Sequence, residues 1–456
     1  MKTPRRGGSH ELIRRRLLRF AFLLFALLFL PVSPSPRLPV SVAAGAERVT
    51  TATREGRLAV FDDVWATLGE RYYDPQLNGV DWSAQRAALR PLAAEASGEA
   101  EFYAVLRRLI GRLRDVHTRV FQPEERSEWQ RPRLLDVGLA VREIEGEIVI
   151  TRVERDAAAW RAGVRAGDPV LSVDGENAAA RLARRLTEEG GASTAQAARL
   201  RALARLFDGP IHEPAAVLVS VTRGGEQRTR AALLPRVLRT REPLISVRRE
   251  GNFAVVHFPL FTQEIVVELM RALERDELRK ARGIIIDLRD NGGGEAEAMA
   301  DMASAFLPEG IDLGHFTDRF GRVTSAPQTR RTLLLAATPI NNFHGPLVIL
   351  TSARTSSAAE IFVAALKEAG RATVVGETTC GCVLGIRRRH PLPDGGLLDI
   401  SEMDFRTASD RRLEGAGVAP DEVSQPTRRD IREGRDPAIK RALEILKAQA
   451  RSHRDT

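Results

Sequence analysis

Cysteine is nearly absent from this chain of 456 residues, which contains only Cys380 and Cys382. A framework of several disulfides is therefore excluded. Two cysteines in a Cys-Gly-Cys segment, without a histidine at ligand spacing, also make a poor metal site, so we predict no metal ion and no other cofactor. Two free thiols are the simpler interpretation of the pair, and a disulfide formed in an oxidising compartment is the alternative.

Positive charge is scarce outside the amino-terminal segment. Residues 1–46 contain eight basic side chains and one acidic side chain, so they carry +7 of the formal net charge of +9. The remaining chain is nearly neutral, which argues against nucleic acid as a partner. That remainder also lacks any apolar run of about 18 residues, so we expect it to be soluble.

The amino-terminal segment has the organisation of a secretory signal. Residues 14–19 are rich in arginine, residues 20–30 are apolar, and residues 44–46 offer a cleavage site of small side chains. An apolar run of 11 residues is too short to span a bilayer comfortably. We therefore predict that residues 1–46 are a signal peptide and that the protein is exported, to a periplasm or to the cell exterior. A retained leader would instead anchor the chain to a membrane.

Hydrophobic periodicity divides the rest of the chain into regions. Apolar side chains recur every three or four positions between residues 55 and 116, which predicts a helical region at 47–134. From residue 252 onward, short apolar strands alternate with helices, so we predict an α/β core with parallel strands over 238–427. A polar tail with a last helix follows at 428–456. The segment between the helical region and the core is rich in predicted strands.

The first segment that carries chemistry is a glycine loop after a buried strand. The strand at residues 283–288 ends before Gly292-Gly293-Gly294. Glycines let a substrate approach backbone N–H groups, and fixed N–H dipoles stabilise a developing negative charge, so the loop is a good oxyanion hole. Neither Gly-Lys-Ser/Thr nor Gly-x-Gly-x-x-Gly occurs here, which disfavours nucleotide binding.

The second segment is a serine-rich turn between a strand and a helix. It places Ser357 just before a helix that begins near Ala358. The free N–H groups and the dipole of a helix amino terminus favour an oxyanion at this position. A serine that only caps the helix is the structural alternative.

Four segments in order resemble the C-terminal processing and tricorn-type serine proteases, over about residues 55–425. They read DLRDNGGG, SARTSSAAEI, GRATVVGETT and LEGAGVAPD. The resemblance implies a ClpP/crotonase-like α/β catalytic core with an N-terminal helical region, and a nucleophile at Ser357. It also implies that the oxyanion is bound by the N–H groups of Gly292 or Gly293 and of Ala358.

Residues 135–237 resemble a PDZ domain inserted ahead of that core. The stretch RAGVRAGDPVLSVDG has the helix–turn–strand signature of PDZ domains, and VGLAV lies where their carboxylate-binding loop would be. Such domains add a peptide as an extra strand and hold its terminal carboxylate with backbone N–H groups. The resemblance therefore implies peptide binding at Val137, Gly138, Leu139 and Ala140. A spacer domain that binds nothing is the alternative.

The scarcity of lysine in this chain argues against a lysine as the general base. Processing-type members use a lysine in a Thr-x-Gly-Lys context, and here that position holds Cys382. Lys367 lies on the same helix as Ser357, but ten residues along it, about 15 Å away, so it does not reach. The remaining lysines end a surface-type helix or lie near the chain termini (Lys2, Lys280, Lys440 and Lys447). A Ser–Lys dyad is therefore disfavoured.

Tricorn-type members use a histidine and a glutamate instead, and the chain resembles them more closely. The segment LRDVHTRVF supplies His117 as the base, and LEGAGVAPD supplies Glu414 to orient the imidazole. The family has a serine just before this histidine, where the chain has Val116. A histidine base predicts that activity falls below about pH 6 to 7. Cys382 as nucleophile is a minor alternative that needs a lowered thiol pKa.

Together these features predict an exported serine peptidase that cleaves unfolded or C-terminally presented polypeptides. The expected partners are polypeptide substrates, and a membrane only if the leader is retained. The alternative from another class is a catalytically inactive family member that binds a peptide or a hydrophobic ligand. The absence of the processing-type lysine favours this alternative. A scaffold anchored by the leader is a third interpretation.

Overall fold

The computed structural model describes residues 49–125, 133–189, 191–223, 226–240, 244–330 and 343–452. The predicted signal peptide at 1–46 lies outside these ranges. Within them, no helix combines the length and the apolar character that crossing a membrane requires.

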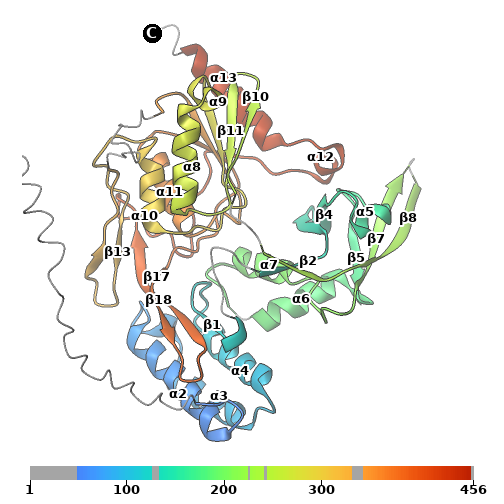
Figure 1. The fold of residues 1–456 in the computed structure, drawn as a ribbon, viewed down its shortest axis with the longest axis vertical. Coiled ribbons are helices and arrows are strands. Elements are labelled where there is room, and N and C mark those ends of the chain that lie inside the picture. Colours follow the sequence, from blue (N-terminus) through green and yellow to red (C-terminus); the bar gives the residue numbers. More distant parts are fainter. Residues whose placement is uncertain are drawn as a thin grey trace, which may run out of the picture. The chain divides into compact units, whose positions relative to one another are not determined.

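A six-stranded sheet forms the centre of the α/β core (Figure 1). Its strands pair in parallel except at one edge, where β10 is antiparallel to β11. Every residue of β12 is buried, as expected for a strand covered on both faces. The parallel α/β arrangement is thus confirmed. In spatial order the strands are β10 (Ser246–Glu250), β11 (Phe253–His257), β12 (Ile284–Asp287), β15 (Leu347–Thr351), β16 (Thr373–Gly376) and β19 (Glu422–Val423).

Helices cover both faces of this sheet because alternate strand residues point to opposite sides. Ile284 and Ile286 belong to the core shared with four helices, whereas Ile285 belongs to the core shared with a carboxyl-terminal helix (Figure 1). The helical stretch that follows β11 is interrupted after Glu274. The helices are α8 (Gln263–Glu274), α9 (Asp276–Arg279), α10 (Ala296–Ser304), α11 (Ala358–Glu368), α12 (Arg428–Glu433) and α13 (Pro437–Ser452).

A second sheet connects the amino-terminal helices to the core. Strand β1 begins at Arg119, directly after the loop that carries His117, and pairs antiparallel with β18, with Val120 opposite Leu398. Leu398 is buried in the same core as the helices. The third helix of this region has Gly98 as its N-cap. These elements are α2 (Arg54–Arg71), η1 (Leu77–Gly79), α3 (Trp82–Glu95), α4 (Glu99–Gly111), β1 (Arg119–Phe121), η2 (Pro123–Glu125), β13 (His315–Thr317), β14 (Val323–Ser325), β17 (Gly385–Pro391) and β18 (Leu397–Arg406).

The region between β1 and β10 is rich in strands and has a hydrophobic core of its own, which includes Val141, Ile150 and Val219. Its described residues form two two-stranded sheets and one four-stranded sheet, as expected for a β-rich insertion. Its elements are β2 (Arg133–Asp136), β3 (Leu139–Ile144), β4 (Glu147–Val153), α5 (Ala158–Arg161), β5 (Val170–Val173), β6 (Glu176–Asn177), α6 (Ala178–Glu189), α7 (Ala195–Ala204), β7 (Ala215–Arg223), β8 (Glu226–Leu234) and β9 (Val237–Thr240).

Candidate active site

Ser357 lies in the turn between β15 and α11, where it is the N-cap residue of the helix. Its backbone angles are φ 57° and ψ −127°, a conformation that residues other than glycine rarely adopt. Its N–H donates to the Cys382 carbonyl at 2.8 Å and to the Glu360 carboxylate at 3.2 Å, which holds the turn. A serine in a strained turn from strand to helix is the device that exposes the nucleophile of α/β-hydrolases.

The glycine loop after β12 lies directly against this serine. Gly293 has φ 95°, and a Cβ atom added to it would lie 2.6 Å from the Cβ of Ser357. Only glycine permits so close an approach. The N–H of Ser356 donates to the Asn291 carbonyl at 3.1 Å, which joins the two segments through their backbones. The structure therefore brings the two predicted motifs together.

The predicted oxyanion donors differ in their availability. The N–H of Gly292 donates to the Pro259 carbonyl at 3.0 Å, and the N–H of Gly293 donates to Oδ1 of Asn291 at 2.9 Å. Both glycine donors are therefore occupied in this conformation, contrary to the sequence-based expectation that they face the substrate. Ala358 is the first residue of α11, where a backbone N–H has no acceptor within the helix, so it is the remaining predicted donor.

His117 is held in place by its neighbour Asp115. The buried carboxylate of Asp115 accepts hydrogen bonds from the N–H of His117 at 2.8 Å, from Ser401 Oγ at 2.9 Å and from the Tyr72 hydroxyl at 3.0 Å. In the part of the chain that the structure describes, the enclosed Nδ1 of His117 has no hydrogen-bond partner. Burial lowers the pKa of His117 to about 4, so its imidazole is neutral at pH 7.

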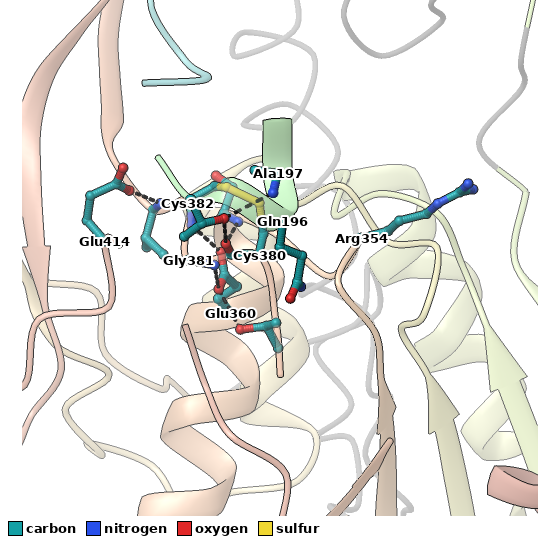
Figure 2. The surroundings of a disulfide bond; sticks show 12 residues. Gln196, Ala197, Arg354, Glu360, Cys380, Gly381, Cys382 and Glu414 are labelled. Atoms are coloured by element: carbon teal, nitrogen blue, oxygen red, sulfur yellow. Dashed lines mark hydrogen bonds between the residues drawn. A yellow bond between two sulfur atoms is a disulfide. The ribbon is translucent and has the colours of Figure 1, made fainter. Parts of the chain in front are cut away.

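Glu414 lies beside the segment that follows the two cysteines (Figure 2). Its Oε2 accepts a hydrogen bond from the N–H of Val383 at 2.6 Å. Burial raises the pKa of this carboxyl to about 7, and the negative charges of Asp115 and Glu360 add to the increase. Glu414 is therefore only partly ionised at neutral pH, and its ionisation responds to small changes in its surroundings.

The three predicted catalytic residues come from segments that meet around Cys380 and Cys382. Ser357 bonds to Cys382, Glu414 bonds to the next residue, and the residue before His117 packs against the cysteine pair. The described residues nevertheless show no hydrogen bond from the His117 ring to Ser357 or to Glu414. The structure thus gathers the segments but does not form the predicted relay of hydrogen bonds.

Cys380 and Cys382 form a disulfide, so the simpler interpretation as two free thiols is wrong. A sulfur held in a disulfide has no thiolate to act as a nucleophile, which removes the alternative role of Cys382.

Lys367 donates to the Ala419 carbonyl at 2.7 Å and pairs with Asp421 at 2.8 Å, as expected for a lysine that does not act as the base for Ser357. Within the described ranges, no group of three or more His, Cys, Asp or Glu side chains is arranged to hold a metal ion.

Glu360 is a residue of the site that we did not predict as functional. It is fully buried on α11, and its carboxyl oxygens accept hydrogen bonds from Thr379 Oγ1 at 2.5 Å and from the N–H groups of Gly381 at 2.7 Å and Cys382 at 2.9 Å, besides that of Ser357. Burial raises its pKa to about 7, against the effect of these donors. The Ser-x-x-Glu spacing, a signature of helix amino termini, is the signal that could have identified it.

The predicted peptide-binding loop lies at the start of β3. The N–H of Gly138, which has φ 75°, donates to Oδ1 of Asp136 at 2.7 Å, so this donor is occupied. Val137 is buried, and Leu139 and Ala140 begin β3. Among the described strands β3 pairs only with β4, so its other edge has no strand partner among them. Peptide binding at this edge stays a prediction.

Two family models match parts of this chain. Residues 252–424, which hold the glycine loop, Ser357 and Glu414, match the family model for peptidase family S41. Residues 54–111 match the model for the tricorn protease C1 domain. The site residues therefore lie within or next to segments that characterise peptidases.

Individual relatives cover most of the chain. Carboxyl-terminal-processing peptidase 1 of Arabidopsis thaliana is 24% identical over 84% of this chain and 74% of its own length. Tricorn protease homolog 1 of Streptomyces coelicolor is 27% identical over 90% of this chain but 37% of its own length. The solved structure of mature CPAF with lactacystin superposes with a TM-score of 0.62 at 14% identity, over 87% of this chain and 98% of that one, so the fold is shared. The chain is therefore similar to the peptidases of family S41 over residues 252–424, and it is a serine-type hydrolase.

Proposed function

We propose that this chain hydrolyses peptide bonds with Ser357 as nucleophile, His117 as general base and Glu414 as the residue that orients the imidazole. The observation that carries the proposal is the left-handed backbone of Ser357 at the amino end of α11, packed against Gly293. Such strain is retained where a surrounding structure imposes it, and it is common at catalytic residues.

In the proposed reaction, Ser357 Oγ attacks the substrate carbonyl while His117 takes up the hydroxyl proton. Its imidazole is neutral at pH 7, as a base must be. Catalytic hydrogen bonds are often long in enzymes without substrate and tighten when it binds, so the proposal includes an approach of the His117 loop towards Ser357. The unpartnered Nδ1 is the position at which the Glu414 carboxylate would then stabilise the imidazolium.

The proposed substrates are unfolded polypeptides or polypeptides with an accessible carboxyl terminus. Relatives named as carboxyl-terminal-processing peptidases support this class. The edge of β3 that has no partner among the described strands would let the PDZ-like insertion add a peptide as a further strand. We also propose export by residues 1–46, which the disulfide supports because such bonds persist in oxidising compartments.

The second candidate function is peptide or ligand binding without catalysis. It is favoured by the internal hydrogen bonds of Gly292 and Gly293, which leave these N–H groups engaged. An enzyme would have to release at least one of them or rely on Ala358 to bind the oxyanion.

Degradation of model substrates separates the two functions. We would compare an unstructured polypeptide and two short peptides, one with a free and one with an amidated carboxyl terminus, using the wild type and the Ser357→Ala variant. The peptidase proposal expects cleavage by the wild type only, with the free carboxyl terminus preferred. Binding of the same peptides to both proteins without any cleavage would establish the second candidate instead.

The acid side of the pH profile should be set by Glu414 rather than by His117. Since the pKa of Glu414 is raised to about 7 and that of His117 is lowered to about 4, kcat/KM should fall as Glu414 becomes protonated below pH 7. The sequence alone instead predicts that protonation of His117 causes the fall in activity at acidic pH. The Glu414→Gln variant should lose this limb and should be about 10²- to 10⁴-fold less active at pH 8.

The exposed Glu309→Gln substitution is the matched control for this measurement, and it should retain the profile of the wild type. An acid limb that remains near pH 7 in Glu414→Gln would show that another group controls it.

A further inference from the structure

We propose that the Cys380–Cys382 disulfide is a positioning element of the active site. It fixes the positions of the segments that carry Ser357, Glu414 and His117 relative to one another. This inference rests on the proposed function. Residues 380–383 contact all three parts of the site, through Ser357, Glu414 and Val116. Cys382 occupies the position that the processing-type resemblance assigns to a lysine, so the disulfide stands where other members carry their base.

On the side of the nucleophile, backbone hydrogen bonds flank the disulfide. The Cys382 carbonyl accepts from the N–H of Ser357 at 2.8 Å, and the N–H of Cys380 donates to the Thr355 carbonyl at 2.9 Å. Both cysteines are buried, with 8% of Cys380 and none of Cys382 exposed, so these bonds are shielded from water. The position of Cys382 therefore directly affects the position of Ser357.

Gly381, between the two cysteines, connects the pair to the Glu414 segment. Its carbonyl accepts from the N–H of Gly415 at 2.9 Å, and its own N–H donates to Glu360 at 2.7 Å (Figure 2). It has φ 70°, and a Cβ atom at this position would lie 3.1 Å from the backbone nitrogen of Ala416. The short ring closed by the disulfide thus fits closely under the loop that carries Glu414.

On the side of the base, the sulfur atoms form part of a small apolar cluster. Ala197 on α7 is buried against Cys380 and Cys382, and Val116 packs against this cluster (Figure 2). Thr194, the N-cap of α7, also donates to the Cys380 carbonyl at 2.9 Å. Because Val116 directly precedes His117, the apolar surface of the disulfide supports the loop of the proposed base.

Opening the disulfide would loosen this arrangement without removing any proposed catalytic group. A small dithiol reductant transfers two electrons and two protons to the S–S bond, which breaks to give two thiols while the reductant closes to a cyclic disulfide. The Cys-Gly-Cys segment then regains rotations that the ring excluded. Since small misplacements of catalytic groups reduce rates strongly, we expect kcat to fall by about 10- to 100-fold, with KM changed less than about twofold.

The test uses the whole folded chain before and after treatment with the dithiol, with thiols counted by alkylation under denaturing conditions. Hydrolysis of an unstructured polypeptide gives kcat and KM, and reoxidation should restore kcat. The Cys380→Ser/Cys382→Ser double variant is the matched control, whose low kcat should not respond to the reductant. A kcat that does not change after complete reduction of the wild type would overturn the proposal.

A second measurement does not depend on activity. On reduction, amide hydrogen exchange should accelerate in segments 113–119, 350–358 and 378–385, while α13 should stay protected. Faster exchange in these three segments of a chain that hydrolyses nothing would support the positioning role and overturn the proposed function. Unchanged exchange in all three would contradict the positioning role, whatever the activity.

Discussion

The Ser357→Ala variant is expected to lose peptide hydrolysis almost completely, with kcat lower by about 10⁵- to 10⁶-fold. The substitution removes the attacking oxygen and leaves only stabilisation by backbone groups. It keeps the Cβ atom that packs against Gly293 and the N–H that donates to Cys382 and Glu360, so the fold should remain intact. Steady-state hydrolysis of an unstructured polypeptide and thermal unfolding would measure the two effects separately.

The Ser409→Ala variant is the control for this loss, because Ser409 is exposed in a turn and its hydroxyl forms a hydrogen bond with that of the nearby Thr407. Its activity should equal that of the wild type. A Ser357→Ala protein that is folded and still hydrolyses the substrate at more than about a tenth of the wild-type rate would show that another group is the nucleophile.

The His117→Ala variant should lower kcat by about 10³- to 10⁴-fold, because no base would then take up the serine proton. Added imidazole should restore part of the activity by occupying the space of the missing ring. His212→Ala, at an exposed position, is the matched control and should be fully active. Near-normal turnover of His117→Ala without imidazole would contradict the assignment of the base.

The same variant offers a readout in stability. The pKa of His117 is lowered from 6.5 to about 4 in the folded chain, so between these pH values the unfolded chain binds more protons at this position. The contribution of His117 to the free energy of unfolding is therefore present above pH 6.5 and is lost as the pH falls towards 4. His117→Ala should lose less stability than the wild type over this interval, as chemical denaturation at pH 7 and at pH 5 would show.

Local patterns predicted the elements that place the nucleophile. The apolar strands before the glycine loop and before Ser357 appear as β12 and β15, and their parallel pairing, with Asp287 opposite Leu350, brings the two following loops to the same edge of the sheet. Parallel strands meet at their carboxyl ends, so this juxtaposition follows from the fold class alone. The region around Ser357 was therefore predictable from the sequence.

Contacts between distant segments could not be predicted in the same way. The acceptors of Gly292 and Gly293 are Pro259 O and Asn291 Oδ1, and a glycine loop alone does not reveal that its N–H groups are engaged. The low pKa of His117 likewise results from burial that depends on tertiary packing. The disulfide joins cysteines separated by one residue, a spacing that the sequence alone left open.

Labelling with a fluorophosphonate probe shows whether Ser357 is an activated nucleophile, because the probe reacts with a serine hydroxyl activated by a base, and peptide mass spectrometry then identifies the labelled residue. We expect one label on the wild type, at Ser357, no label on Ser357→Ala, and slow labelling of Ser357 in His117→Ala. A wild-type chain that is folded and oxidised but carries no label, or a Ser357→Ala variant that is labelled at the wild-type rate, would contradict this expectation.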